Sequence, residues 1–226
     1  PPPIPDFALS VLAAIVAQTP EAAKIRTQAE HGDASAQYRL GQHYAAAQNL
    51  MEAKKWYEKA AAQGYADAAY KLGRLYDDAH DRNKAGQYYE TARRQWEKAA
   101  TAGDADAQYR LGIEFAGEAG AQHAETARYW LEKAAAQNNA DAAFKLGLMH
   151  DEGEGTARDH AKAETYYRQA LAQWQQEDAS GNADAQYKLG VMYREGLGVA
   201  ADAAQARSWF EKAAMQGNSM AKAALE

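Results

Sequence analysis

The sequence predicts an all-α fold, a right-handed α-solenoid of about five antiparallel helix-hairpin repeats with an N-terminal capping hairpin and a C-terminal helix. Ala makes up about a quarter of the chain and β-branched residues are sparse. Ala is the strongest helix former, whereas β-branched residues favour sheets. A Leu-Gly pair recurs at equivalent places in five segments, and an Ala-rich segment with a pair of adjacent large side chains follows each one. Such an internal repeat is typical of a solenoid.

The first helix of each repeat, helix A, contains the Leu-Gly pair and is predicted to begin about eight residues before its glycine. Nine residues before that glycine stands another Gly, which Asn138 replaces in the fourth repeat. Gly and Asn accept the left-handed backbone that ends a preceding helix. An Asp or Asn then follows as the expected N-cap, except at Tyr65. The five pairs are Leu40-Gly41, Leu72-Gly73, Leu111-Gly112, Leu146-Gly147 and Leu189-Gly190.

The second helix, helix B, is marked by two alanines seven residues apart, with the doublet between them. The small alanines let helices A and B approach closely, and the large ring is expected to fill the gap to the next repeat. Repeats two and four carry seven additional residues, which lengthen helix B by roughly 10 Å. The alanine pairs are Ala53 and Ala60, Ala85 and Ala92, Ala127 and Ala134, Ala163 and Ala170, and Ala206 and Ala213.

These landmarks divide the chain into seven parts. Residues 1–31 form the capping hairpin, with helices expected over Phe7–Val16 and Glu21–His31. The C-terminal partial helix occupies residues 217–226. The five repeats between them cover residues 32–63, 64–102, 103–137, 138–180 and 181–216.

The repeated motif resembles the Sel-one-like repeat (SLR), a relative of the tetratricopeptide repeat. The resemblance rests on Ala-Gln-Tyr-Arg-Leu-Gly followed by Trp-Tyr-Glu-Lys-Ala-Ala-x-Gln-Gly, and it covers roughly residues 32–226. Repeats four and five also show the long Gly-containing connector of that family. The resemblance implies an adaptor or scaffold for protein complexes and names no particular partner. Some cysteine-rich relatives are associated with β-lactam binding, and this chain lacks their cysteines.

Charge and composition exclude several classes of function. The formal net charge is −6, which disfavours nucleic acid as a partner, since phosphate binding needs clustered positive charge. The apolar run Phe7–Ala17 is too short to insert across a membrane.

The chain begins with Pro rather than Met, which suggests a removed leader or a trimmed chain. A periplasmic or secreted location is expected, with a cytoplasmic one as the alternative.

The side of helix A that faces away from helix B is predicted to line a concave binding surface. One position there is aromatic in all five repeats, and the position four residues later turns apolar towards the C-terminus. The rings either bind a peptide or merely pack between neighbouring A helices, and the second interpretation is favoured for a residue that recurs in every repeat. The concave-face candidates are Tyr38, Gln42, Tyr70, Arg74, Tyr109, Ile113, Phe144, Leu148, Met149, Tyr187, Val191 and Met192.

Three other features are weighed in the same way. Met149 and Met192 either extend an adaptable apolar patch or pack in the core, and core packing is favoured. Trp96 and Trp174, on the helix B extensions, either thicken the array or form a protruding ledge for a partner or a second copy. A basic residue precedes each Leu-Gly pair, but most of these are expected to pair with the Asp four residues earlier.

The sequence gives little support for metal binding or catalysis. The stretch from His150 to His160 is rich in possible metal ligands, yet it aligns with the connector of the next repeat, so no metal site is predicted. There is no Cys, only five Ser, and no phosphate-binding or dinucleotide motif. No catalytic residue and no cofactor are therefore predicted.

These observations predict that the chain is a bacterial, non-enzymatic module that binds a protein or peptide through its concave face. A narrower form is an immunity or inhibitor protein that neutralises a partner protein. The alternatives are a binder of a small molecule or cell-wall fragment and a self-associating structural element.

Overall fold

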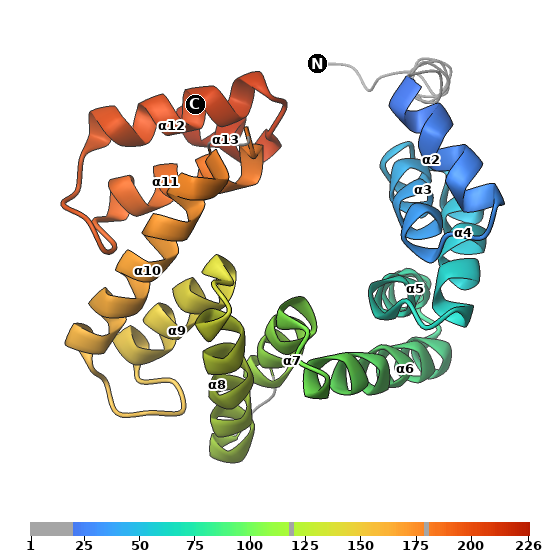
Figure 1. Ribbon diagram of the computed structural model, residues 1–226, viewed down its shortest axis with the longest axis horizontal. Helices are drawn as coiled ribbons and strands as arrows, with labels where there is room; N and C mark the ends of the chain where they lie inside the picture. Colours follow the sequence, from blue (N-terminus) through green and yellow to red (C-terminus); the bar gives the residue numbers. More distant parts are fainter. Residues whose placement is uncertain (1–19, 118–119, 179–180) are drawn as a thin grey trace. The chain divides into compact units, whose positions relative to one another are not determined.

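The computed structural model describes residues 20–117, 120–178 and 181–226, and every regular element in this part of the chain is an α-helix (Figure 1). The all-α prediction is confirmed. The predicted helix over Phe7–Val16 lies outside the described residues. The helices are α2 (Pro20–Glu30), α3 (Ala34–Ala46), α4 (Leu50–Ala62), α5 (Ala66–Asp78), α6 (Arg82–Thr101), α7 (Ala105–Ala116), α8 (Ala121–Ala136), α9 (Ala140–Glu152), α10 (His160–Asp178), α11 (Ala183–Glu195), α12 (Ala203–Met215) and α13 (Ser219–Leu225).

The chain divides into two compact units, residues 1–98 and 99–226, and the division falls within α6. In the first unit, α2 packs on α3, α3 on α4 and α4 on α5. In the second unit, each helix from α7 to α13 packs on the next one along the chain. Within each unit these helices contact their neighbours in sequence, which is the packing of an α-solenoid. No helix in the described ranges is long and apolar enough to span a bilayer.

The predicted starts of the A helices are confirmed. The side chain of Asp33 accepts a hydrogen bond from the backbone N–H of Ala36, and Asp104, Asn139, Asn182 and Asn218 cap their helices in the same way. Tyr65 stands at the equivalent position of α5 without a side-chain cap. Asn138, in place of the usual Gly, has a φ of 67°, in the left-handed region. Side-chain caps thus mark the start of α3, α7, α9, α11 and α13, whereas α5 begins without one.

The close contact between helices A and B is made at the glycine of each Leu-Gly pair. A Cβ atom added to any of these five glycines would lie no more than 2.6 Å from the second doublet residue of the same repeat. The doublet side chain therefore fills the space within its own hairpin. Tyr57 also lies in one core cluster with Ala68 and Leu72 of the next repeat, so the ring serves both places. The contacting residues are Tyr57, Tyr89, Leu131, Tyr167 and Phe210.

The alanine pairs of helix B are buried as predicted, with at most 3% of each residue exposed. The long connectors of repeats four and five also pack closely. A Cβ atom on Gly155 would overlap Ala124 of α8, and one on Gly198 would lie 2.7 Å from the backbone of Tyr167 in α10. Both glycines also have positive φ. Each long connector thus lies directly against helix B of the preceding repeat.

A buried Gln near the start of helix A joins elements in repeats one, three and five. Gln108 Nε2 donates to the carbonyl oxygen of Ala100 at 3.1 Å, and its Oε1 accepts from Gln137 Nε2 at 2.8 Å. Gln37 makes the same two contacts in the first unit, with Ala29 and Gln63. In repeats two and four this position is Ala69 and Ala143.

The glycine contact is tested by a matched pair of substitutions. Gly147→Ala is expected to lower the free energy of unfolding by about 1–3 kcal/mol, because the new methyl group overlaps the buried Tyr167 ring. Gly86→Ala, in the exposed interior of α6, meets no atom within 4 Å and is expected to raise it by about 0.5–1 kcal/mol. Thermal and urea denaturation followed by circular dichroism measures both. Equal stability of the two variants would contradict this account of helix packing.

Candidate binding pocket

Seven of the predicted site residues in the second unit line one pocket of about 360 Å³. Three A helices supply six of the side chains, and the extension of α10 supplies the seventh. Asp141, Lys145 and Lys188 complete the lining. The seven are Tyr109 and Ile113 of α7, Phe144 and Leu148 of α9, Tyr187 and Val191 of α11, and Trp174 of α10.

Helical periodicity explains why these residues come together. In each A helix an aromatic residue and an aliphatic residue stand four positions apart, so both side chains lie on the same face. The Leu-Gly pair turns the opposite face towards helix B. Ile113 is 39% exposed, and Leu148 and Val191 are half-buried. The pocket is therefore an open apolar surface rather than part of the core.

The aromatic members of the pocket also support the fold. The Phe144 ring lies 5.4 Å from the Trp174 ring and 5.7 Å from the Tyr167 ring, between ring centroids. The Tyr187 ring lies 5.7 Å from Phe210 of α12. Of the two interpretations given for this position, packing thus holds for both rings. The packing is against helix B of the same repeat rather than between A helices.

The site residues predicted in the first unit make comparable contacts there. The Tyr38 hydroxyl accepts a hydrogen bond from Gln42 Nε2 at 3.1 Å, and the Tyr38 ring is buried. The Tyr70 ring lies 5.4 Å from Tyr89 and is 37% exposed, and Arg74 is exposed.

The prediction that Met149 and Met192 line the binding surface is wrong. Both residues are fully buried and belong to the core of the second unit. Each stands one position after a pocket residue, and one helical step of 100° turns its side chain from the open face into the core. The alternative expectation of core packing is the one the structure supports.

The expectation of a protruding ledge at Trp96 and Trp174 is also wrong, since only 6% and 2% of these residues are exposed. Trp96 Nε1 donates to Asp67 Oδ1 at 3.0 Å, and its ring lies 5.5 Å from Tyr70. Trp174 forms part of the pocket wall. Both rings thus thicken the hairpin rather than protrude from it.

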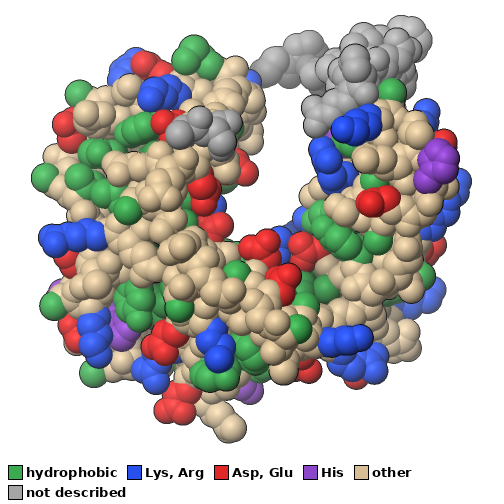
Figure 2. All heavy atoms as spheres, in the orientation of Figure 1, with side chains coloured by type: hydrophobic (Ala, Val, Ile, Leu, Met, Phe, Trp, Pro, Cys, Tyr) green, Lys and Arg blue, Asp and Glu red, His purple; other side chains and the backbone are tan. Residues whose placement is uncertain are grey.

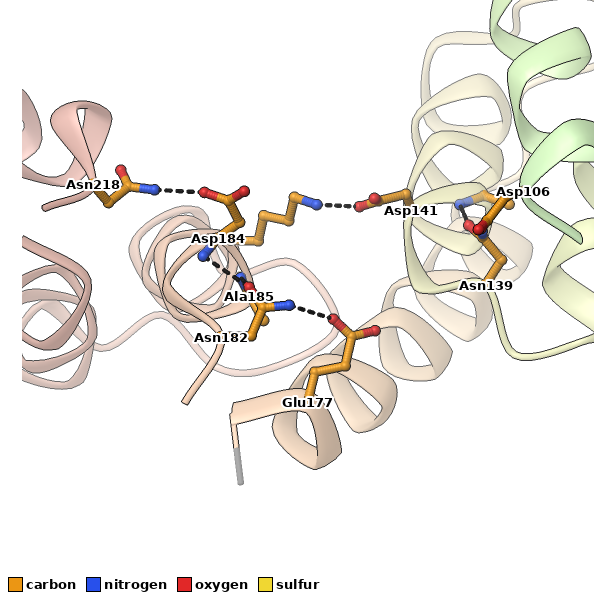
Figure 3. Close-up of polar contacts among 10 residues, drawn as sticks. Asp106, Asn139, Asp141, Glu177, Asn182, Asp184, Ala185 and Asn218 are labelled. Carbon is orange, nitrogen blue, oxygen red and sulfur yellow. Dashed lines mark hydrogen bonds and ion pairs between the residues drawn. The ribbon is translucent and has the colours of Figure 1, made fainter. Parts of the chain in front are cut away.

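The ion pairs of the pocket differ from the expected pairing of residues four apart. Lys188 Nζ of α11 lies 2.5 Å from Asp141 Oδ1 of α9, which joins two repeats (Figure 3). Lys145 Nζ lies 2.9 Å from Glu154 Oε2 in the connector of its own repeat. The basic residues thus serve contacts beyond their own helical turn, which spacing along one helix does not reveal.

Further polar contacts follow the ends of the A helices (Figure 3). Asn139 Nδ2 donates to Asp106 at 3.2 Å, and Asn218 Nδ2 donates to Asp184 at 2.8 Å. Asn182 instead donates to Glu177 of the α10 extension at 3.4 Å. Over the visible face of the molecule, acidic and basic side chains are interspersed (Figure 2).

The sequence matches the Sel1 repeat in five segments, residues 34–65, 66–95, 105–139, 140–173 and 183–218. The chain belongs to the Sel1 repeat family. Sel1 repeats generally form non-catalytic scaffolds for protein interactions. No curated protein matches the chain.

Several solved Sel1-type structures are similar. An immunity protein from Pseudomonas aeruginosa has a TM-score of 0.54 at 18% identity, over 95% of this chain and 83% of the other, and shares the fold. A protective antigen present in uropathogenic Escherichia coli strains has a TM-score of 0.49 at 28% identity, over 90% of this chain and 50% of the antigen, so this chain spans half its length. A protein from Klebsiella pneumoniae has a TM-score of 0.49 at 26% identity, over 89% and 96% of the two chains.

The His-rich stretch of the fourth Sel1 repeat has a packing role at its first residue. The His150 ring is 96% buried and stacks on Tyr166 of α10, with centroids 5.6 Å apart and the planes at 9°. Its Nδ1 atom has no hydrogen-bond partner among the residues that the structure describes. His160, by contrast, is exposed and contacts Asp151 through its Nδ1. Among the described residues, no three His, Asp or Glu side chains are placed to hold a metal ion.

Burial gives His150 a role in pH-dependent stability. Desolvation, reinforced by Lys162 and Arg128 and opposed by Asp159 and Glu132, holds the pKa of His150 below its ordinary value of 6.5. The unfolded chain then binds the proton more readily than the folded chain. The stabilising contribution of neutral His150 is complete above pH 6.5 and is lost as the pH falls through 6.5 towards the folded-state pKa.

The variant His150→Tyr is therefore expected to lose less stability than the original chain between pH 7 and pH 5. Urea denaturation at half-unit pH intervals measures the difference. His43→Gln, at an exposed position of α3, is the control and should leave the profile unchanged. Parallel profiles for the original chain and His150→Tyr would show that His150 is not the titrating group.

Proposed function

We propose that the chain is a non-enzymatic interaction module that binds a segment of a partner protein in the pocket formed by α7, α9, α10 and α11. The observation that carries this proposal is the meeting of seven apolar side chains, from three successive A helices and one extended B helix, on an open surface. Apolar and aromatic anchors supply most of the binding energy at protein interfaces. The family supports the same function, since Sel1 repeats commonly mediate protein interactions.

The proposed occupant is a helix or an extended strand of the partner that inserts apolar side chains between the rows of α7, α9 and α11. An immunity protein, which would neutralise its partner by covering it, is a narrower form of the same proposal. A periplasmic or secreted location stays a prediction, with a cytoplasmic one as the alternative, and cell fractionation tests it.

Substitutions must separate binding from folding. Phe144 and Tyr187 pack on helix B, so changing these rings to Ala would also loosen the hairpins. Ile113, Leu148 and Val191 are better targets because all three are partly exposed aliphatic side chains. Leu50 and Met51 of α4, 51% and 81% exposed, provide matched control positions in the first unit.

The partner is first identified with a photo-crosslinking residue placed at Ile113, and at Met51 as the control. The crosslink is expected from Ile113 and not from Met51. The purified partner should then bind the variant Ile113→Ser/Leu148→Ser/Val191→Ser at least about tenfold more weakly in isothermal titration calorimetry. The variant Leu50→Ser/Met51→Ser should bind as the original chain does. Unchanged affinity of the pocket variant, with its melting temperature preserved, would refute the proposed site.

The second candidate is a small-molecule or cell-wall-fragment binder. The pocket volume of about 360 Å³ favours it, since small-molecule sites commonly measure about 300–1,000 Å³. A ligand of this kind should raise the melting temperature in a thermal-shift screen, because it binds the folded chain alone. The same ligand should leave the melting temperature of the variant Ile113→Ser/Leu148→Ser/Val191→Ser unchanged. A shift that persists in the pocket variant would place the ligand elsewhere.

A further inference from the structure

The charged side chains that line the pocket are paired within this chain. Lys188 Nζ lies 2.5 Å from Asp141 Oδ1, and Lys145 Nζ lies 2.9 Å from Glu154 Oε2. Asp141, Lys145 and Lys188 are the charged members of the lining, so each of them already faces an opposite charge. Charge complementarity therefore favours an occupant that presents an uncharged, apolar stripe to the pocket.

The backbone around the pocket is occupied as well. Every residue of the lining belongs to an α-helix, where N–H and C=O groups bond to one another along the helix. No β-strand occurs in the described ranges, so that part of the chain has no sheet edge to which a partner strand could pair. The uncharged polar groups of the lining are the hydroxyls of Tyr109 and Tyr187 and the indole N–H of Trp174.

An extended partner segment would bury backbone groups that this surface cannot satisfy. Each strand residue carries one N–H and one C=O, so a strand of about five residues presents about ten such groups. A buried polar group without a hydrogen bond opposes binding. An α-helix satisfies its own backbone and can cover an apolar groove with side chains alone.

The aromatic rings of the pocket are used by the fold, which disfavours a proline-rich occupant. A segment in the polyproline II conformation docks in grooves lined by aromatic rings. Here Trp174 is only 2% exposed, and the Phe144 ring lies 5.4 Å from Trp174 and 5.7 Å from Tyr167, between centroids. The Tyr187 ring packs on Phe210 in the same way. These rings therefore support the hairpins instead of forming free faces for proline.

We infer that the partner segment is an amphipathic α-helix whose uncharged apolar side chains, three and four positions apart, fill the pocket. The inference rests on the proposed function and decides between the helix and the extended strand named there. The apolar stripe of this helix lies over Ile113, Leu148 and Val191, one from each of the three A helices. The helix needs no hydrogen bond from the pocket, so its side chains alone set the affinity.

A displayed library of random peptides tests the inference without knowledge of the partner. The peptides have about 16 residues, which is enough for about four helical turns. They are selected on the original chain after depletion on the variant Ile113→Ser/Leu148→Ser/Val191→Ser. The enriched sequences are expected to carry uncharged apolar residues at positions i, i+4 and i+7, with no Pro within that span.

A selected peptide is then changed at two Ala positions that face away from its apolar stripe. Replacing each Ala by Gly lowers the helix propensity and leaves every anchor in place. The affinity for the original chain, measured by isothermal titration calorimetry, is expected to fall about fivefold for each Gly. Equal affinities of the Ala and Gly forms would show that the peptide does not bind as a helix and would overturn the inference.

The possible results separate this inference from the proposed function. Peptides that depend on the pocket but carry alternating apolar residues or a Pro-x-x-Pro pattern would overturn the inference and leave the pocket supported. The variant Leu50→Ser/Met51→Ser is the control and should bind the selected peptides as the original chain does. A library in which no peptide distinguishes the original chain from the pocket variant would count against the pocket itself. Circular dichroism of each variant ensures that folded proteins are compared.

Discussion

The contact between the helix A glycine and the second doublet residue of helix B is the constraint on which the rest of the structure depends. A side chain at that position would overlap a ring or a leucine in every repeat, so glycine is required for close approach. The contact also fixes the rotation of helix A about its own axis. Once Gly147 faces Tyr167, Phe144 and Leu148 must lie on the open side. The pocket is therefore a consequence of how each hairpin closes.

Two forms of hairpin alternate along the chain, and they differ in what fills the interior near the start of helix A. In the repeats with a short helix B, a buried Gln is held by the Gln that ends helix B, as for Gln108 and Gln137. In the repeats with a long helix B, the Gln becomes Ala and the extension brings a Trp. The polar pair is thus replaced by an aromatic ring. In the fourth repeat this substitution places Trp174 in the pocket wall.

Much of this architecture could be predicted from the sequence because it is set locally. The caps, the left-handed residues and the buried alanines depend on residues within one or two turns. The open face was predicted for the same reason, since Ile113 and Val191 follow from the position of the Leu-Gly pair. Met149 and Met192 were misplaced because the width of the open face depends on how closely the neighbouring helices pack. Ion pairs such as that between Lys188 and Asp141 join residues 47 positions apart, and spacing along one helix carries no information about them.

The length of helix B changes the polar contacts made at the end of a hairpin without new residue types in helix A. The fourth and fifth repeats carry an Asp and a basic residue at the same positions as the second and third. The extension of α10 brings Glu177 within reach of Asn182, the residue equivalent to Asn139. Asn139 binds Asp106, the Asp of the preceding helix A, whereas Asp141 is bound by Lys188. An insertion of seven residues can thus change the contacts of one pair of repeats while the Leu-Gly pairs and the buried alanines of the hairpins stay the same.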